Sequence, residues 1–564
     1  MKIAGVLLSS PFYFCNITMK KLFLTAFVSL YACSVWCCTN LLVGKAASTD
    51  GSTMVTYSAD SYALFGELYH RPAKTYPEGA LLKVYEWDTG KYLGEINQVK
   101  QTYHVIGNMN EHQLCIAETT FTGREELADS TGIMDYGSLM YITLQRAKTA
   151  REAISVMTGL VEQYGYYSTG ESFSIGDKNE IWILEMIGKG AGNTGAVWVA
   201  VRIPDDCIAA HANQSRIHQF PLNDKENCIY STDVISFARE KGYFSGNDKD
   251  FSFAKAYCPY DFAGLRFCEA RVWSFFNRFY KNAGRWLNYA TGDNPDNTMP
   301  LYIKPDRQLS VKDLMATMRD HYEGTYFDMT VDAGSGPFSS PTRFPPITWK
   351  VDSVEYCNER PIGTQQTGFT FVGQMRNSLP DEVGALLWFG VDDATFSVYT
   401  PMYANISEVP ECYREGNGDL YHFSWTSSFW IHNWIANMAY MRYSQMSPDI
   451  VAVQSELENG FLEMQSSVER KARELLKKDK NQAIALLTNY SVTEAQRAFD
   501  TWKKLGERML IKYMDGIVRQ EENRIFKTNE YGKPRSPVRA GYSDSHYRMI
   551  VKDTGDKLKT KTIQ

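Results

Sequence analysis

The chain has 564 residues, with 59 basic and 65 acidic side chains, a formal net charge of −6 and 44% hydrophobic residues. This composition is close to the average for soluble globular proteins, and it excludes a wholly disordered chain, a collagen-like fibre and a polytopic membrane protein. It also argues against a dedicated nucleic-acid binder, because binding a phosphate backbone requires a concentrated basic surface.

The amino terminus has the pattern of an export signal. Residues 1–37 contain three lysines and no acidic residue, and a Lys-Lys pair is followed by an apolar run from Leu22 to Ala32. The run is too short to span a membrane comfortably and ends in small residues, as signal peptides do. We expect residues 1–37 to be a signal peptide, with Met19 as an alternative start. The mature protein would then be periplasmic or extracellular and have no transmembrane span. The sequence before Cys33 also loosely resembles a lipoprotein cleavage box, which leaves surface attachment open.

Cleavage after residue 37 would give a chain that begins with Cys38. That residue would then carry both a free thiol and a free α-amine, whose ordinary pKa of about 7.7–8.0 makes it available as a base near neutral pH. A nucleophile that is deprotonated by its own amine needs no histidine partner. Cys38 is therefore a candidate nucleophile, and the alternative is that its side chain only packs in the core.

The segments after Cys38 predict short strands and turns. Two apolar runs separated by Asp50-Gly51 predict a β-hairpin whose second strand ends near Asp60. Leu114 to Ala117 has the pattern of a buried strand. Residues 139–163 have apolar side chains at helical spacing, and residues 172–220 return to strand patterns. The order sheet, helix, sheet predicts a layered sandwich.

Motifs that would indicate a dinucleotide site, a metal site or a redox pair are weak or missing in the sequence. Gly190 to Gly195 matches GxGxxG, but strand patterns lie on both sides, whereas a dinucleotide site needs a helix after the glycines. This segment is therefore predicted to be a hairpin loop. The histidines lack metal-ligand spacing, and the seven cysteines after Cys38 are scattered without CxxC pairs. We expect these cysteines to be buried free thiols, and we expect no metal and no cofactor.

The carboxyl-terminal part is predicted to be helical. A helix begins at Ser310, with Asp313 at the capping-box position. Residues 447–526 are predicted to form a helical hairpin, with one helix from Ser447-Pro448 to about residue 478 and a second from a capping box at Ser491 to about residue 525. Residues 527–564 are basic, with Pro and Gly breaks, and we expect a partly flexible tail.

Several of these motifs together resemble the N-terminal-nucleophile cysteine dipeptidases, the family of bacterial dipeptidase A and the secernins. The resemblance covers most of residues 38–450. Its motifs are Cys38-Thr39, Val43-Gly44-Lys45, Asp50-Gly51-Ser52, Asp60-Ser61, Gly107 to Glu111, Glu118-Thr119-Thr120, Trp182 to Glu185, Trp198 to Pro204, Ala212-Asn213 and Ala270 to Trp273.

The resemblance implies an α+β fold, the four-layer αββα sandwich, with residues 38–446 as the catalytic domain. It implies that Cys38 is nucleophile and base together, and that Asp60 holds the new amino terminus. By looser analogy, Asn213 would contribute to an oxyanion hole and Arg271 would add positive charge beside the nucleophile. Asn213 could instead make only local turn contacts, and Arg271 could form a structural ion pair. Many relatives have Arg where this chain has Tyr57, so the role of that position is uncertain.

Substrate binding is expected around the strand that ends near Glu118. Its carboxylate could receive the free amine of a dipeptide, or it could cap the following turn. Asn110 and Thr120 belong to the same matching segments and are the other candidate binding residues.

Taken together, the sequence predicts an exported cysteine-type dipeptidase whose partners are dipeptide substrates. The alternatives are an acylase of the same fold that cuts a non-peptide amide, such as a bile-salt conjugate or a penicillin-like compound, and an inactive secreted binding protein. The sequence leaves side-chain preference open, together with the choice between monomer and homo-oligomer.

Overall fold

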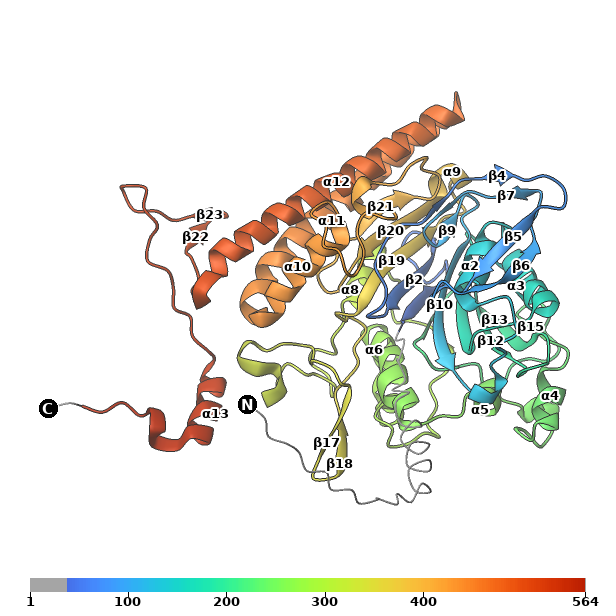
Figure 1. Cartoon of the computed structure of the whole chain (residues 1–564), viewed down its shortest axis with the longest axis horizontal. Helices are drawn as coiled ribbons and strands as arrows, with labels where there is room; N and C mark the ends of the chain where they lie inside the picture. The colour runs from blue at the N-terminus through green and yellow to red at the C-terminus, as the bar shows by residue number, and fades with distance from the viewer. Residues whose placement is uncertain (1–37, 563–564) are drawn as a thin grey trace, which may run out of the picture. The chain divides into compact units, whose positions relative to one another are not determined.

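The computed structural model describes residues 38–562, which form mixed α and β structure with several antiparallel sheets (Figure 1). The predicted signal peptide, residues 1–37, lies outside the described residues. Two large sheets carry Asp60, Asn110, Glu118 and Thr120 of the candidate site residues.

A seven-stranded sheet begins directly after the candidate nucleophile. The predicted hairpin is confirmed: β1 (Asn40–Val43) pairs antiparallel with β2 (Thr53–Asp60), and Leu42 lies opposite Val55. Every residue of β2 is buried, so both faces of the sheet are covered there. The other strands are β14 (Ile208–His211), β16 (Tyr302–Ile303), β19 (Thr367–Met375), β20 (Ala385–Val391) and β21 (Thr400–Tyr403). Their order is β16-β14-β1-β2-β19-β20-β21.

An eight-stranded sheet contains the predicted buried strand as β10. Its order is β15-β13-β12-β11-β10-β9-β8-β3. The bounds are β3 (His70–Arg71), β8 (Val105–Ile106), β9 (Met109–Asn110), β10 (Cys115–Thr122), β11 (Gly170–Gly176), β12 (Ile181–Gly188), β13 (Ala196–Ile203) and β15 (Cys228–Tyr230). The glycine-rich segment joins β12 to β13, which confirms the hairpin loop.

A buried histidine links the two sheets. His211 on β14 shares hydrogen bonds with Thr119 on β10 and Ser174 on β11, each at 2.7 Å. Burial and the nearby Arg216 lower the pKa of His211 to about 3, so its imidazole is neutral at physiological pH. It acts as a satisfied core residue.

Helices pack on both sheets. On the eight-stranded sheet, α2 (Tyr136–Leu144) contacts β10 and α3 (Ala150–Tyr164) contacts β11. The single helix predicted over residues 139–163 is wrong, because Thr149 starts a new helix by accepting a hydrogen bond from the Glu152 N–H. On the seven-stranded sheet, α8 (Val311–Met318) packs on β2 and β19, and its predicted Ser310–Asp313 capping box is confirmed.

Three consecutive helices, coloured orange to red in Figure 1, follow the sheets: α10 (Ser428–Met441), α11 (Tyr443–Leu476) and α12 (Lys480–Tyr513). The predicted capping box at Ser491 is wrong. Asp479 caps α12, while Ser491 is buried within that helix and accepts a hydrogen bond from the Tyr403 N–H at 3.4 Å. The expected tail contains a further helix, α13 (Asp544–Thr554). Among the described residues, no helix has the length and apolar character to cross a membrane.

Candidate active site

Cys38 lies at the entrance to β1, and hydrogen bonds hold its backbone. Thr39, the next residue, pairs with Ser58 on β2 through two backbone hydrogen bonds of 3.0 and 3.4 Å. The carbonyl oxygen of Cys38 accepts a hydrogen bond of 2.6 Å from Nη1 of Arg271, which lies on α6 (Ala270–Phe279). The thiol is therefore presented from a fixed backbone, and the residue is only 4% exposed.

Two oxygen atoms lie close to the sulfur. The thiol donates to Glu118 Oε1 at 3.7 Å and to the Tyr57 hydroxyl oxygen at 3.9 Å, and the Tyr57 hydroxyl itself donates to Glu118 Oε1. Burial raises the pKa of the Cys38 thiol well above its usual value, and the negative charges of Glu118 and Asp60 raise it further. The resting thiol is therefore protonated, and a base must remove its proton before it can attack.

Glu118 belongs to a buried pair of carboxyl groups. Thr120 lies opposite Glu171 in the register of β10 and β11, so Glu118 and Glu171 are diagonal neighbours on one face of the sheet. The two buried carboxyl groups influence each other's ionisation, so that one of them keeps its proton when the other is charged. Burial raises the pKa of both groups, and the charge of Glu118 raises that of Glu171 further. The Thr120 hydroxyl donates to Glu171 Oε2 at 3.0 Å.

A third carboxyl group extends this acidic cluster, which consists of Asp88, Glu118 and Glu171. Asp88 accepts a hydrogen bond of 2.8 Å from the Tyr136 hydroxyl, and burial and the charge of Glu118 raise its pKa to about 7. Within residues 38–562, no lysine or arginine forms an ion pair with any of the three. The cluster therefore has a strong electrostatic preference for a cationic group.

The acidic pair gives a pH-dependent stability. Glu171→Gln keeps the shape of the protonated side chain but cannot ionise. Because the pKa of Glu171 is raised on folding, the wild type loses stability as the pH rises above the unfolded value of about 4.3 towards the folded value. We expect the variant to be more stable than the wild type by about 1–3 kcal/mol at pH 8, relative to their difference at pH 4. Urea unfolding at both pH values measures the difference in the free energy of unfolding between the two proteins. A difference that does not change with pH would contradict the prediction.

Asp60 lies at the end of β2, and its carboxylate is held by distant residues. It accepts hydrogen bonds from Arg360 Nη2 at 2.7 Å and from the Thr367 hydroxyl at 2.6 Å. Burial nevertheless raises its pKa, against the opposing effect of Arg360. Its backbone N–H hydrogen-bonds towards the Cys38 sulfur and so opposes the rise in the thiol pKa.

Arg271 connects Asn213 to the nucleophile. The fully buried guanidinium donates to the Cys38 carbonyl oxygen with Nη1 and to Asn213 Oδ1 with Nη2, the latter at 3.0 Å. Asn213 adopts a left-handed backbone conformation, with φ of 67°, and donates from Nδ2 to the Thr120 carbonyl oxygen at 2.8 Å. The second N–H of Nδ2 has no partner among residues 38–562, so it is available to a ligand.

Glu185 supports the segment that carries Asn213. Its carboxylate accepts hydrogen bonds from the backbone N–H groups of Arg216 and Ile217 and from the Ser215 hydroxyl. Burial raises the pKa of Glu185 to about 7 despite these donors. The Trp182 to Glu185 segment, noted for its resemblance, therefore ends in a residue that shapes the site.

The predicted site residues separate into two groups. Five of them are linked directly or through one shared partner: Cys38, Asp60, Glu118, Asn213 and Arg271. Thr120 contacts both Asn213 and Glu171. The structure does not bring Asn110 into this network. Its amide donates to the carbonyl oxygens of Leu144 and Ala147, both at 2.8 Å, and its Oδ1 accepts from the His112 and Leu114 N–H groups. Asn110 therefore organises a loop.

Sequence reasoning missed several residues of the site. Glu171 lies on β11, one residue before the region of residues 172–220 that is predicted to form strands, and Asp88 lies in a turn between β5 (Leu81–Tyr85) and β6 (Tyr92–Asn97). An acidic residue inside a buried strand was the available signal for Glu171, because such residues are rarely fully buried without a partner. Arg360 and Thr367 contact Asp60 across about 300 residues of sequence, and no local pattern marks them.

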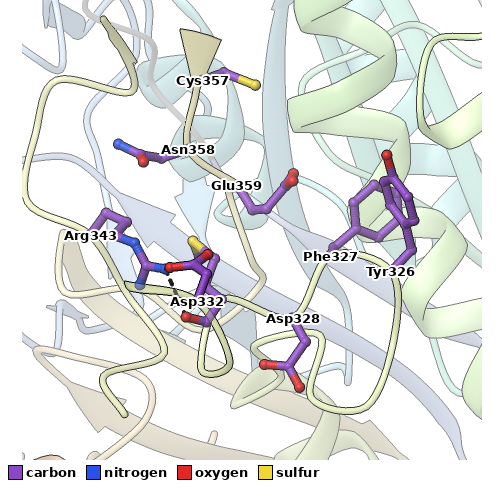
Figure 2. Close-up of a pocket in the computed structure, with 9 residues that line it drawn as sticks. Tyr326, Phe327, Asp328, Asp332, Arg343, Cys357, Asn358 and Glu359 are labelled. Carbon is purple, nitrogen blue, oxygen red and sulfur yellow. Dashed lines mark hydrogen bonds and ion pairs between the residues drawn. The ribbon is translucent and has the colours of Figure 1, made fainter. Parts of the chain in front are cut away.

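A separate pocket of about 140 Å³ lies beside the hairpin of β17 (Thr348–Val351) and β18 (Val354–Cys357). Figure 2 shows Arg343 facing Asp332, with which it forms an ion pair of 2.6 Å. Glu359, another lining residue, pairs with Arg266 at 2.6 Å. Burial and the charge of Glu359 raise the pKa of the lining Cys357 thiol. This pocket contains none of the predicted site residues, so the Cys38 region remains the candidate active site.

The chain is similar in sequence to known proteins. A family model described as peptidase family C69 matches residues 37–456. Among similar proteins, the "Probable dipeptidase" of Latilactobacillus sakei is 25% identical over 72% of this chain and 81% of its own length. That of Salmonella dublin is 27% identical over 68% of this chain and 85% of its own, and "Dipeptidase A" of Lactobacillus helveticus is 26% identical over 75% and 84%.

Proposed function

We propose that this chain, which belongs to peptidase family C69 and is a peptidase, is an exported dipeptidase with Cys38 as its amino-terminal nucleophile. Three observations support this proposal: the family match, the dipeptidase names of its relatives, and a thiol 3.7 Å from a carboxylate in an acidic cluster without a paired cation. The last observation is the one that supports a dipeptide as the substrate.

The proposed nucleophile is activated by its own amine. Once residues 1–37 are removed, the α-amine of Cys38 takes the thiol proton, and the sulfur attacks the scissile carbonyl carbon. The second amino acid leaves as the acyl-enzyme forms, and water then releases the first. We propose that Asp60 holds the new terminus, because its backbone already faces the sulfur and its carboxylate is fixed by Arg360.

The oxyanion that forms during attack needs a fixed hydrogen-bond donor. We propose that the second N–H of Asn213 Nδ2 provides it, since Arg271 fixes the orientation of the amide by donating to Oδ1. Arg271 also holds the Cys38 carbonyl, so one guanidinium aligns the nucleophile with the donor.

The acidic cluster favours a free amine next to the scissile bond. In an amino-terminal residue, the amine nitrogen lies about 2.5 Å from the carbonyl carbon. An ammonium bound to Glu118 therefore places that carbon within reach of a sulfur that is 3.7 Å from the same carboxylate. A bile-salt or penicillin-type amide has no ammonium at this position. The geometry thus supports a dipeptide substrate over the acylase alternative.

We also propose that the two sheets and their covering helices form the four-layer αββα sandwich, with residues 38–446 as the catalytic domain and 447–526 as its helical extension. The contacts of His211 between the sheets support this arrangement. The basic and apolar pattern of residues 1–37 supports export.

Acetylation of the substrate amine tests the proposed function. We expect N-acetylation of a dipeptide to lower kcat/KM by at least about 100-fold, because the acidic cluster then faces a neutral amide in place of an ammonium. The assay measures the rates at which the wild-type protein hydrolyses the free dipeptide, the acetylated dipeptide and a glycine-conjugated bile salt. Equal rates on free and acetylated dipeptides, or faster cleavage of the bile salt, would contradict a dipeptidase.

A further inference from the structure

Tyr57 holds its hydroxyl group between the sulfur of Cys38 and the carboxylate of Glu118. The hydroxyl oxygen is 3.9 Å from the sulfur, and its proton is donated to Glu118 Oε1. The aromatic ring cannot move freely, because it packs edge-on against Phe369 and Phe371 on β19, at centroid distances of 5.5 and 5.8 Å. Tyr57 is 4% exposed, so water does not compete for its hydroxyl.

The charges around the sulfur oppose a thiolate. The Glu118 carboxylate on β10 lies 3.7 Å from it, the charge of Asp60 on β2 acts on it through space, and Glu171 on β11 acts through Glu118. Tyr136 on α2 lies close enough to interact electrostatically with Cys38. The nearby positive groups are engaged elsewhere: Arg271 donates to the Cys38 carbonyl oxygen, and Arg360 donates to Asp60. Apart from the α-ammonium that forms on Cys38 in the proposed mechanism, hydrogen-bond donors at the sulfur are therefore the remaining way to stabilise the negative charge.

Two groups among residues 38–562 can donate to the sulfur. One is the Asp60 backbone N–H, and the other is the Tyr57 hydroxyl, and each hydrogen bond favours the thiolate. Burial and the charges of Cys38 and Glu118 raise the pKa of Tyr57 well above its usual value. The hydroxyl therefore keeps its proton at neutral pH and remains a donor throughout the reaction.

We propose that Tyr57 is a further catalytic residue, whose hydroxyl donates its hydrogen bond to the Cys38 sulfur during attack on the substrate. This role rests on the proposed function. The Tyr57 hydroxyl turns from Glu118 to the sulfur when the thiol loses its proton, and in the complex the substrate ammonium replaces it as the donor to Glu118. The thiol proton passes to the Cys38 α-amine, a sulfur electron pair forms the carbon–sulfur bond, and the carbonyl electron pair moves to oxygen. Tyr57 neither gains nor loses a proton.

The test compares Tyr57→Phe, which removes only the hydroxyl, with Tyr399→Phe. Tyr399 is a matched control, because its buried hydroxyl shares a hydrogen bond with Thr370 and makes none with Cys38. The rate of alkylation of Cys38 by iodoacetamide is followed against pH, using mass spectrometry of the peptide that contains Cys38. We expect the pH midpoint of the Cys38 alkylation rate to rise by about one pH unit in Tyr57→Phe, since a hydrogen bond to the thiolate is lost. In Tyr399→Phe it should stay unchanged.

Steady-state kinetics on a dipeptide provide the second readout. We expect Tyr57→Phe to lower kcat about 10- to 100-fold with little change in KM, because the hydrogen bond acts during attack. Alkylation of Cys357 in the same samples should be unaffected. An unchanged midpoint in a folded Tyr57→Phe protein would overturn the proposal, and so would a shifted midpoint with unchanged kcat.

Should Tyr57→Phe fail to fold, 3-fluorotyrosine at position 57 provides a nearly isosteric alternative. Its hydroxyl is a stronger donor, so the alkylation midpoint should fall, and an unchanged midpoint would refute the role of Tyr57. Because alkylation reports on the thiol without any substrate, this result is separate from the proposed function. That function fails on its own if the Cys38→Ala protein still hydrolyses dipeptides.

Discussion

Replacing Cys38 with alanine is expected to lower kcat/KM for dipeptides by at least about four orders of magnitude. The reason is that in the proposed mechanism the sulfur forms the bond to the substrate, and no other described nucleophile lies in the acidic cluster. The fold should persist, since Arg271 holds the carbonyl of residue 38, Ser58 pairs with the backbone of Thr39, and the side chain of residue 38 is small. The assay measures dipeptide hydrolysis beside urea unfolding.

Cys412→Ala provides the control for this experiment, because Cys412 is another buried free thiol. Its activity should remain within a factor of about two of the wild type. Hydrolysis that survives in Cys38→Ala would reject the nucleophile. Mass spectrometry of the active protein should also find Cys38 as the first residue, and a terminus at Cys37 or at an acylated Cys33 would reject activation by the α-amine.

The second large effect is expected for Arg271→Lys. The guanidinium makes hydrogen bonds to the Cys38 and Ala212 carbonyl oxygens and to Asn213 Oδ1, and a single ammonium cannot reach all three in this geometry. Buried acceptors that lose their donors cost about 1–3 kcal/mol each. We therefore expect a loss of about 3–5 kcal/mol in the free energy of unfolding and a fall in kcat of at least about 100-fold.

A matched variant separates the two effects. Arg376 is also buried and pairs with Glu469 on α11 at 2.6 Å, but it makes no contact with Cys38 or Asn213. Arg376→Lys should lower stability by a similar amount and leave kcat within a factor of about three. A proportional loss of stability and activity in both variants would show that Arg271 acts only on folding.

The sequence predicted the local elements of the fold well where short-range signals decide them. The Asp50-Gly51 hairpin, the capping box at Ser310 and the glycine-rich loop between β12 and β13 all depend on neighbours within a few residues. The two errors have different causes: tertiary packing in one case and a local helix cap in the other. Ser491 has a capping-box pattern, yet α12 continues through it because its buried face packs on β21. Residues 139–163 break at Thr149, where its side chain caps a second helix.

The candidate site was predictable in part. Cys38, Asp60, Glu118, Asn213 and Arg271 came from motifs, and the structure gathers them in one place. Arg360, which fixes Asp60, could not be predicted, because the contact is made by strand pairing and loop packing over 300 residues. Asn110 is the opposite case. It lies within a matching motif, but its hydrogen bonds stabilise the loop that contains the motif.

The hydrogen bond from Arg271 to the Cys38 carbonyl has a consequence for maturation. This contact and the pairing of Thr39 with Ser58 hold residue 38 from its carboxyl side. A peptide nitrogen is not a base, because its lone pair is delocalised into the carbonyl group, whereas a free amine accepts a proton. Under the proposed mechanism, the uncleaved chain would be a proenzyme in which Arg271 already holds residue 38. It would be inactive because the nitrogen of residue 38 is a peptide nitrogen and cannot accept a proton, and activation by cleavage would require no refolding.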